Sequence, residues 1–97
     1  MRIRYSPKSR DDLMNIAMYI GADNPVRART FVSELEEAVS RLADHPERFA
    51  VVRRVSGRAL RRRPLANYSI LYIAEPNEVQ VIRVVSSWMD LDQALET

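Results

Sequence analysis

Arginine is the residue type in this sequence best placed to do chemistry with a charged partner. Six Arg side chains fall within eleven residues, and no acidic residue lies between Glu47 and Glu75. They are Arg53, Arg54, Arg58, Arg61, Arg62 and Arg63. Crowded guanidinium groups repel one another, and each can pair with a carboxylate or a phosphate. The cluster therefore predicts a surface for an acidic protein segment or for nucleic acid, with a plain solvated edge as the alternative.

Groups that could transfer a proton are few. His45 is the only His, and its place at a predicted helix end suits a partner of the helix dipole better than a catalyst. Lys8, the only Lys, is expected to be a solvated charge at a helix start. Asp11 and Asp12 are neighbours, which on a helix point about 100° apart and do not share a proton easily. We expect this acidic pair to compensate the helix dipole instead.

Four further positions each leave two interpretations open. Tyr68 and Tyr72 share one face of a predicted strand, where they either pack beneath helices or offer rings and hydroxyls to a partner. Arg83 lies within a Val-rich strand, so we expect it to be partly buried and paired with Asp90 or with a phosphate. Trp88, the only Trp, follows that strand and either packs on the end of the sheet or anchors a partner.

Length and composition limit the class of protein. The 97 residues carry a net charge of +2 and predict a single domain, 1–97, with one core. Without Cys and with a single His, the chain is expected to hold no metal ion and no cofactor. No apolar run approaches the roughly 20 residues of a membrane helix, so we expect a cytoplasmic protein without a membrane partner.

A helical hairpin should position these residues. A short edge strand at residues 3–5 precedes a helix that starts after Ser6 and ends at Gly21. A second helix starts after Asn24, runs to Asp44 and stops before Pro46. The two apolar faces consist of Leu13, Ile16, Ala17 and Ile20, and of Ala28, Phe31, Val32, Leu35, Val39 and Leu42. The short connection between the helices makes them antiparallel.

The C-terminal half is predicted to be mostly strand. Residues 46–57 show no period and are expected to form a loop. Strands are predicted at residues 60–65, 68–73 and 79–85, the last two joined by a turn at Pro76 and Asn77, followed by a short helix at 90–95. The fold class is therefore α+β, with an antiparallel helical hairpin on one face of a small, mainly antiparallel, four-stranded sheet in the order β-α-α-β-β-β plus a short C-terminal helix.

Several short motifs, in order, resemble one protein family. They are Ser6-Pro7-Lys8, Asp23-Asn24-Pro25, Leu42-Ala43-Asp44-His45-Pro46, Arg61-Arg62 through Pro64, Tyr68-x-Ile70-x-Tyr72, Val81-Ile82-Arg83-Val84-Val85 and Met89-Asp90. With this order and spacing, the chain from Ser6 to Leu95 resembles the ParE branch of the ParE/RelE toxin superfamily of bacterial type II toxin–antitoxin systems. Ser86 is a departure, because many relatives have a His at this position.

The resemblance implies a toxin with a cognate ParD-like antitoxin as partner. ParE toxins poison DNA gyrase on broken DNA, which implies gyrase as the target and indirect contact with DNA, whereas RelE toxins cut mRNA on the ribosome. RNA cleavage needs a base and an acid, which this chain offers sparingly, so we expect no enzyme and no catalytic residue. The alternatives are a RelE-like ribosome-dependent endoribonuclease and an inert toxin that still binds its antitoxin.

Nine residues are the candidates for binding the antitoxin or gyrase and its DNA. They are Arg53, Arg54, Arg58, Arg61, Arg63, Arg83, Tyr68, Tyr72 and Trp88. Side chains alternate along a strand, so Arg62 should point away from Arg61 and Arg63. We expect the side with two Arg residues to be the solvent-facing binding surface, and Arg62 to matter more for stability.

Overall fold

Three helices and five strands follow one another along residues 1–96, the part of the chain that the computed structural model describes. They are β1 (Arg2–Tyr5), α1 (Pro7–Gly21), α2 (Pro25–Arg41), β2 (Val51–Val55), β3 (Arg58–Leu65), β4 (Tyr68–Glu75), β5 (Glu78–Ser86) and α3 (Leu91–Glu96). The predicted α+β class is confirmed. Thr97, the last residue of the predicted domain, lies outside the described residues.

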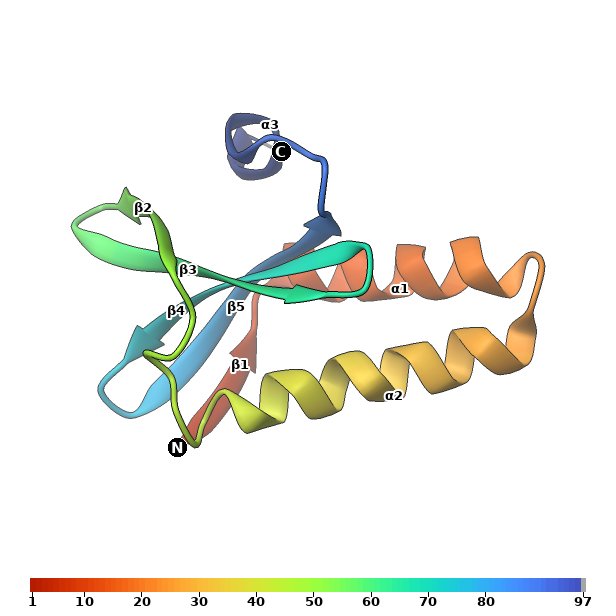
Figure 1. Cartoon of the computed structure of the whole chain (residues 1–97), viewed down its shortest axis with the longest axis horizontal. Coiled ribbons are helices and arrows are strands. Elements are labelled where there is room, and N and C mark those ends of the chain that lie inside the picture. The colour runs from red at the N-terminus through yellow and green to blue at the C-terminus, as the bar shows by residue number, and fades with distance from the viewer. Residues whose placement is uncertain (97) are drawn as a thin grey trace.

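Both long helices begin where the sequence places a cap. The Ser6 side chain accepts a hydrogen bond from the backbone N–H of Ser9 at 3.0 Å, and Asn24 accepts one from the N–H of Arg27 at 3.0 Å. Each helix has Pro in its first turn, where an N–H would have no partner. The predicted starts are confirmed, and α2 ends at Arg41 instead of Asp44. The two helices lie side by side as an antiparallel hairpin (Figure 1).

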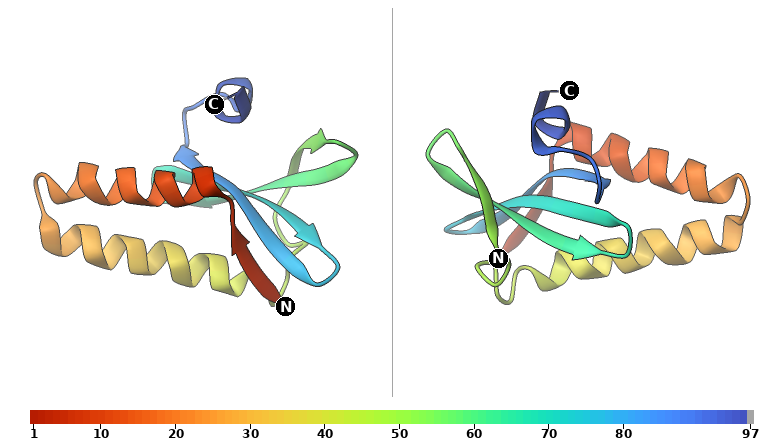
Figure 2. Two further views of the ribbon diagram at one scale, coloured as in Figure 1. Left: turned by 180° about the vertical axis from the view of Figure 1, so that it is seen from behind. Right: turned by 45° about the horizontal axis from the view of Figure 1, so that its top comes forward.

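The strands form one sheet in the order β1-β5-β4-β3-β2, in which only β1 and β5 run parallel. β1 is an edge strand, as predicted, and Figure 2 shows it beside β5. The prediction of four strands and of a loop at 46–57 was wrong, because β2 forms the other edge. A tight turn at Ser56 and Gly57, both with positive φ, folds β2 back on β3.

The sheet has an apolar cluster on each face, where the sequence suggested a single core. The first cluster lies under the helical hairpin and joins Phe31 and Leu35 to the strand residues Ile70, Tyr72 and Val81. The second lies on the opposite face, where α3 packs. Its buried members are Leu60, Leu71, Ile73, Val85 and Ala94. Residues 70–73 are all buried because β4 is covered on both faces.

Candidate partner-binding surfaces

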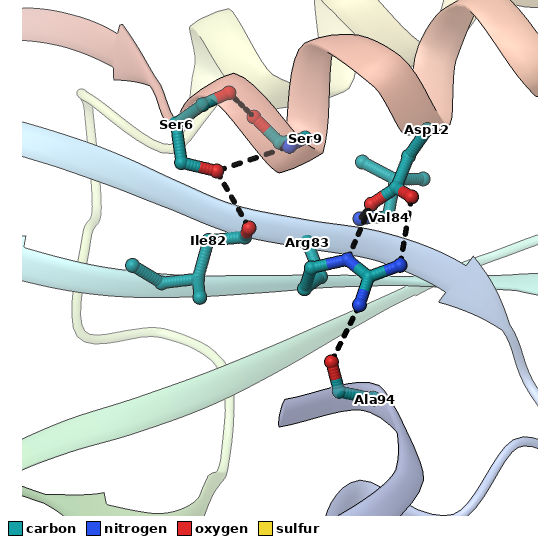
Figure 3. A network of polar contacts seen from close by, with 7 residues as sticks. All are labelled: Ser6, Ser9, Asp12, Ile82, Arg83, Val84 and Ala94. Carbon is teal, nitrogen blue, oxygen red and sulfur yellow. Dashed lines mark hydrogen bonds and ion pairs between the residues drawn. The ribbon is translucent and has the colours of Figure 1, made fainter. Parts of the chain in front are cut away.

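The free edge of β5 beyond β1 is closed by polar side chains of α1 and its cap (Figure 3). β1 pairs with β5 only as far as Tyr5, which lies opposite Val81. One step on, the Ser6 hydroxyl donates to the carbonyl of Ile82 at 2.7 Å. The Asp12 carboxylate then accepts from the backbone N–H of Val84 at 2.9 Å. These two bonds satisfy backbone groups that would otherwise lose their ladder partner.

Arg83 links α1, β5 and α3. Its Nε and Nη2 donate to the two oxygens of Asp12 at 2.8 and 2.9 Å, and its Nη1 donates to the carbonyl of Ala94 (Figure 3). The hydrogen bonds to Asp12 raise the pKa of Arg83 further, so the guanidinium remains charged. The expected burial of Arg83 is confirmed, since its side chain is 13% exposed, but Asp90 was the wrong partner. The predicted dipole role was wrong for Asp12, which lies beyond the first turn of α1 and binds Arg83 and the backbone of Val84 instead.

The Arg cluster divides between the two faces of the sheet. Arg53 pairs with Asp92 of α3 at 2.8 Å, and Arg62 donates to the Ser69 hydroxyl at 2.8 Å. Arg58 of β3 pairs with Glu75 at the end of the neighbouring strand β4. Arg54, close to the β2–β3 turn, donates to the Gly57 carbonyl at 3.4 Å and carries no ion pair within residues 1–96. The cluster therefore does not act as one continuous patch.

Arg61 and Arg63 project to the helical side, beside the loop that follows α2. The predicted alternation is confirmed, because Arg61 lies opposite Tyr72, of the first cluster, whereas Arg62 lies opposite Leu71, of the second. The expectation that the side with two Arg residues would be the open one was wrong. Arg61 Nη1 donates to the carbonyls of Glu47 and Phe49, at 2.9 and 2.8 Å, and so ties this loop to β3.

The two candidate Tyr residues have different surroundings. Tyr72 has no exposed surface, and its hydroxyl donates to the Pro46 carbonyl at 2.8 Å, so core packing accounts for it. Tyr68 is half-buried, with its ring 5.5 Å from that of Phe31. Burial raises the pKa of both hydroxyls, which therefore remain protonated at neutral pH.

Trp88 is exposed at the end of the sheet. Its side chain keeps 77% of its surface accessible, so packing on the sheet does not account for this residue. The preceding Ser87 donates its N–H to the carbonyl of Asn67 at 2.8 Å, which places Trp88 at the same end of the sheet as Tyr68. Tyr19 of α1 is also 77% exposed. Trp is one of the residue types that are enriched among the anchors of protein interfaces.

The described residues contain neither a cluster of metal ligands nor a helix that could span a membrane. Within residues 1–96, no three His, Cys, Asp or Glu side chains come together in a way that could hold a metal ion. None of the helices in that range combines the length and the apolar character needed to cross a membrane.

Comparison with known proteins agrees with this fold and with the motifs. The family model described as "ParE toxin of type II toxin-antitoxin system, parDE" matches residues 3–91. The chain belongs to the ParE toxin family. No curated protein matches the sequence. The ParE-type fold also appears in a solved structure titled "Chromosomal ParDE TA system from P. aeruginosa", with a TM-score of 0.76 and 21% identity. That similarity covers 89% of this chain and 95% of the other.

The structure gives four residues contacts that the sequence did not predict, and they are Ser9, Asp12, Arg48 and Phe49. Ser9 is fully buried and Asp12 is nearly so, and both lie on the sheet-facing side of α1 with Ile16. Ser9, Asp12 and Ile16 are spaced by three and four residues, so they share one face of the helix. Polar residues on an otherwise apolar helix face can be recognised from the sequence alone. Arg48 and Phe49 lie in a segment without any periodic pattern, so no signal in the sequence singles them out.

Proposed function

We propose that this chain is the toxin of a ParDE pair, that it inhibits DNA gyrase in the cytoplasm and so blocks replication, and that a ParD-like antitoxin neutralises it. The match of the ParE toxin family over residues 3–91 carries this proposal. The chain acts by binding and not by catalysis.

The surroundings of the proton-transfer groups support a binding role. Cleavage of RNA requires a base and an acid within reach of the same phosphate. His45 and Lys8 are both exposed, and within residues 1–96 neither is joined by a hydrogen bond or an ion pair to another side chain. The hydroxyl of Tyr72 is engaged by the Pro46 carbonyl. No nucleophile–base pair is therefore assembled among residues 1–96, and mRNA cleavage on the ribosome is the less favoured function.

The candidate residues separate into contact residues and supporting residues. Trp88 and Tyr68 supply apolar surface at one end of the sheet, and Arg53, Arg54 and Arg58 line the β2–β3 hairpin, which projects away from α1 and α2 in Figure 1. We assign these residues to contacts with an acidic antitoxin segment or with gyrase and its DNA. Arg61, Arg83 and Tyr72 are the supporting residues, because partly buried hydrogen bonds hold their polar atoms to other parts of the chain. The ion pairs of Arg53 and Arg58 lie on the surface and are weak, so these two side chains can exchange them for a partner's groups.

Three assays on the purified chain test the proposal. Inhibition of gyrase supercoiling with accumulation of cleaved DNA, relieved by the antitoxin, is the expected result. Codon-dependent cuts in mRNA on translating ribosomes would show a RelE-like endoribonuclease instead. Activity in neither assay, with antitoxin binding retained, would show an inert toxin. Either of these last two outcomes overturns the proposal.

A further inference from the structure

Three arginines meet around Phe49 next to the C-terminal end of α2. The Cζ atoms of Arg48 and Arg63 lie 5.3 and 5.1 Å from the centre of the Phe49 ring. Arg61 Nη1 lies 2.8 Å from the Phe49 carbonyl oxygen. Within residues 1–96, none of the three forms an ion pair with a carboxylate, whereas the adjacent Arg41 pairs with Glu37.

The loop that carries Phe49 is held in place from β3 and β4. The Tyr72 hydroxyl binds the carbonyl of Pro46, and Arg61 binds the carbonyls of Glu47 and Phe49. Phe49 is itself half-buried and packs against the first cluster. Both guanidinium groups contact the ring, and Arg63 Nη1 also donates to the carbonyl of Pro64. The mutual repulsion of these charges favours an anion between them.

A small hollow opens at this position. It has a volume of about 80 Å³ and is lined by Arg41, Leu42, His45, Arg48, Phe49 and Arg63. Guanidinium groups bind planar pairs of phosphate or carboxylate oxygens through parallel N–H donors. The hollow therefore gathers donors for one anionic group.

The surrounding charge determines which anion fits. Asp44 and Glu47 line a wider hollow next to it, and within residues 1–96 neither forms an ion pair. They would repel the successive charges of an acidic peptide or of a continuous nucleic-acid backbone. Guanidinium groups already lie over the Phe49 ring, so it is not open to a stacking base.

We propose that this hollow binds a single phosphomonoester group, recognised without regard to a base. Such a group carries between about −1.5 and −2 charges at neutral pH and offers three terminal oxygens to Arg48, Arg63 and His45. The group can come from free phosphate, from a nucleotide or from the 5′ end of a nucleic-acid strand. The proposal goes beyond gyrase inhibition and does not depend on it.

Calorimetric titration of the full chain, made by cell-free synthesis, tests this site at constant ionic strength. The ligands are inorganic phosphate, a nucleoside 5′-monophosphate, and one oligonucleotide with either a 5′-phosphate or a 5′-hydroxyl. We expect the first two ligands to bind, and the 5′-phosphorylated oligonucleotide to bind at least ~10-fold more tightly than its 5′-hydroxyl form. An acidic peptide of matched charge serves as the competing ligand and should bind more weakly.

A pair of double variants separates this site from diffuse attraction. R48Q/R63Q should weaken phosphate binding at least ~10-fold, whereas R10Q/R29Q should not change it. Each variant loses two positive charges, so the net charges of the two variants are equal. Within residues 1–96, none of the four replaced Arg residues has a carboxylate partner. R48K/R63K keeps the charge but removes the planar donors, so it should show a comparable loss of phosphate binding. This variant replaces R48Q/R63Q in the test if the latter does not fold.

Several outcomes overturn the proposal. They are equal binding of the two oligonucleotides, tighter binding of the acidic peptide, an equal loss in both Gln variants, and no measurable binding of inorganic phosphate. The measurement uses neither gyrase nor antitoxin, so its failure leaves the proposed function standing.

Discussion

Replacing Asp12 by Ala should lower the free energy of unfolding by about 3 kcal/mol. The carboxylate accepts two hydrogen bonds from Arg83 and one from the backbone N–H of Val84, at 2.8 to 2.9 Å. Breaking a buried ion pair costs about 3–5 kcal/mol, because one charge is left without its partner. The Asp12 and Arg83 side chains are still 11% and 13% exposed, which places the expected cost at the lower end of that range.

A urea titration measures this cost, with Asp11→Ala as the control. Asp11 is the exposed neighbour on the same helix, and no ion pair within residues 1–96 involves it, so its removal should change the free energy of unfolding by less than about 0.5 kcal/mol. For a domain of this size, the Asp12→Ala variant should also melt about 12–24 °C lower. The slope of the transition should match that of the unchanged protein.

A loss below about 1 kcal/mol for Asp12→Ala, or equal losses for the two variants, would refute the reasoning. A second variant checks its cause. Asp12→Leu combined with Arg83→Met removes both charges together, so it should be more stable than Asp12→Ala alone. Equal stability would mean that the hydrogen bond to Val84, and not the unpaired charge, determines the cost.

Three other predictions concern the core, the exposed aromatic residue and pH. Phe31→Ala should cost about 3–5 kcal/mol in a denaturant titration, because Phe31 is 3% exposed in the first cluster; a cost under about 1 kcal/mol contradicts this. Trp88→Ala should leave thermal melting unchanged and weaken antitoxin binding by about 2 kcal/mol or more in calorimetry; lost stability with unchanged affinity would reverse its role. Burial raises the pKa of Tyr72 above its usual 10.0, so the protonated form of the hydroxyl favours the folded state. Its contribution to stability should be fully present below pH 10.0 and should be lost as the pH rises beyond that value. Tyr72→Phe removes the hydrogen bond to Pro46, so its free energy of unfolding at neutral pH should be about 1 kcal/mol lower in urea titrations. Above pH 10.0 the stability of this variant should fall less steeply than that of the unchanged protein. An equally steep fall would exclude Tyr72 as a cause of the alkaline loss of stability.

The missed strand β2 shows the limit of periodicity. Its sequence, Val51-Val52-Arg53-Arg54-Val55, does not alternate cleanly, and a register shift between Val51 and Arg53 interrupts its pairing with β3. An edge strand needs only one partner and little burial, so its residues carry a weak apolar signal. The strand exists because the turn at Ser56 and Gly57 returns the chain onto β3.

The second apolar face could have been read from β4. Tyr68, Ile70 and Tyr72 alternate with Ser69, Leu71 and Ile73, so both faces of the strand are largely apolar. Such a run is typical of a strand covered on both sides. The short C-terminal helix was expected, but its packing against Leu60 and Leu71 depends on contacts that no local pattern contains.

The sequence by itself determined the starts of α1 and α2 and the β4 and β5 pairing, because caps, turns and hydrophobic periods act over only a few residues. Its ordered motifs also pointed to the family, by resemblance. Tertiary structure decided the partners of the charges. Arg83 and Asp12 are 71 residues apart, and they meet only because β1 ends at Tyr5 and α1 then crosses the free edge of β5. In the same way, Arg61 holds the loop at Phe49, whereas Trp88 is exposed. The role of a side chain depends on which distant backbone groups lie within its reach.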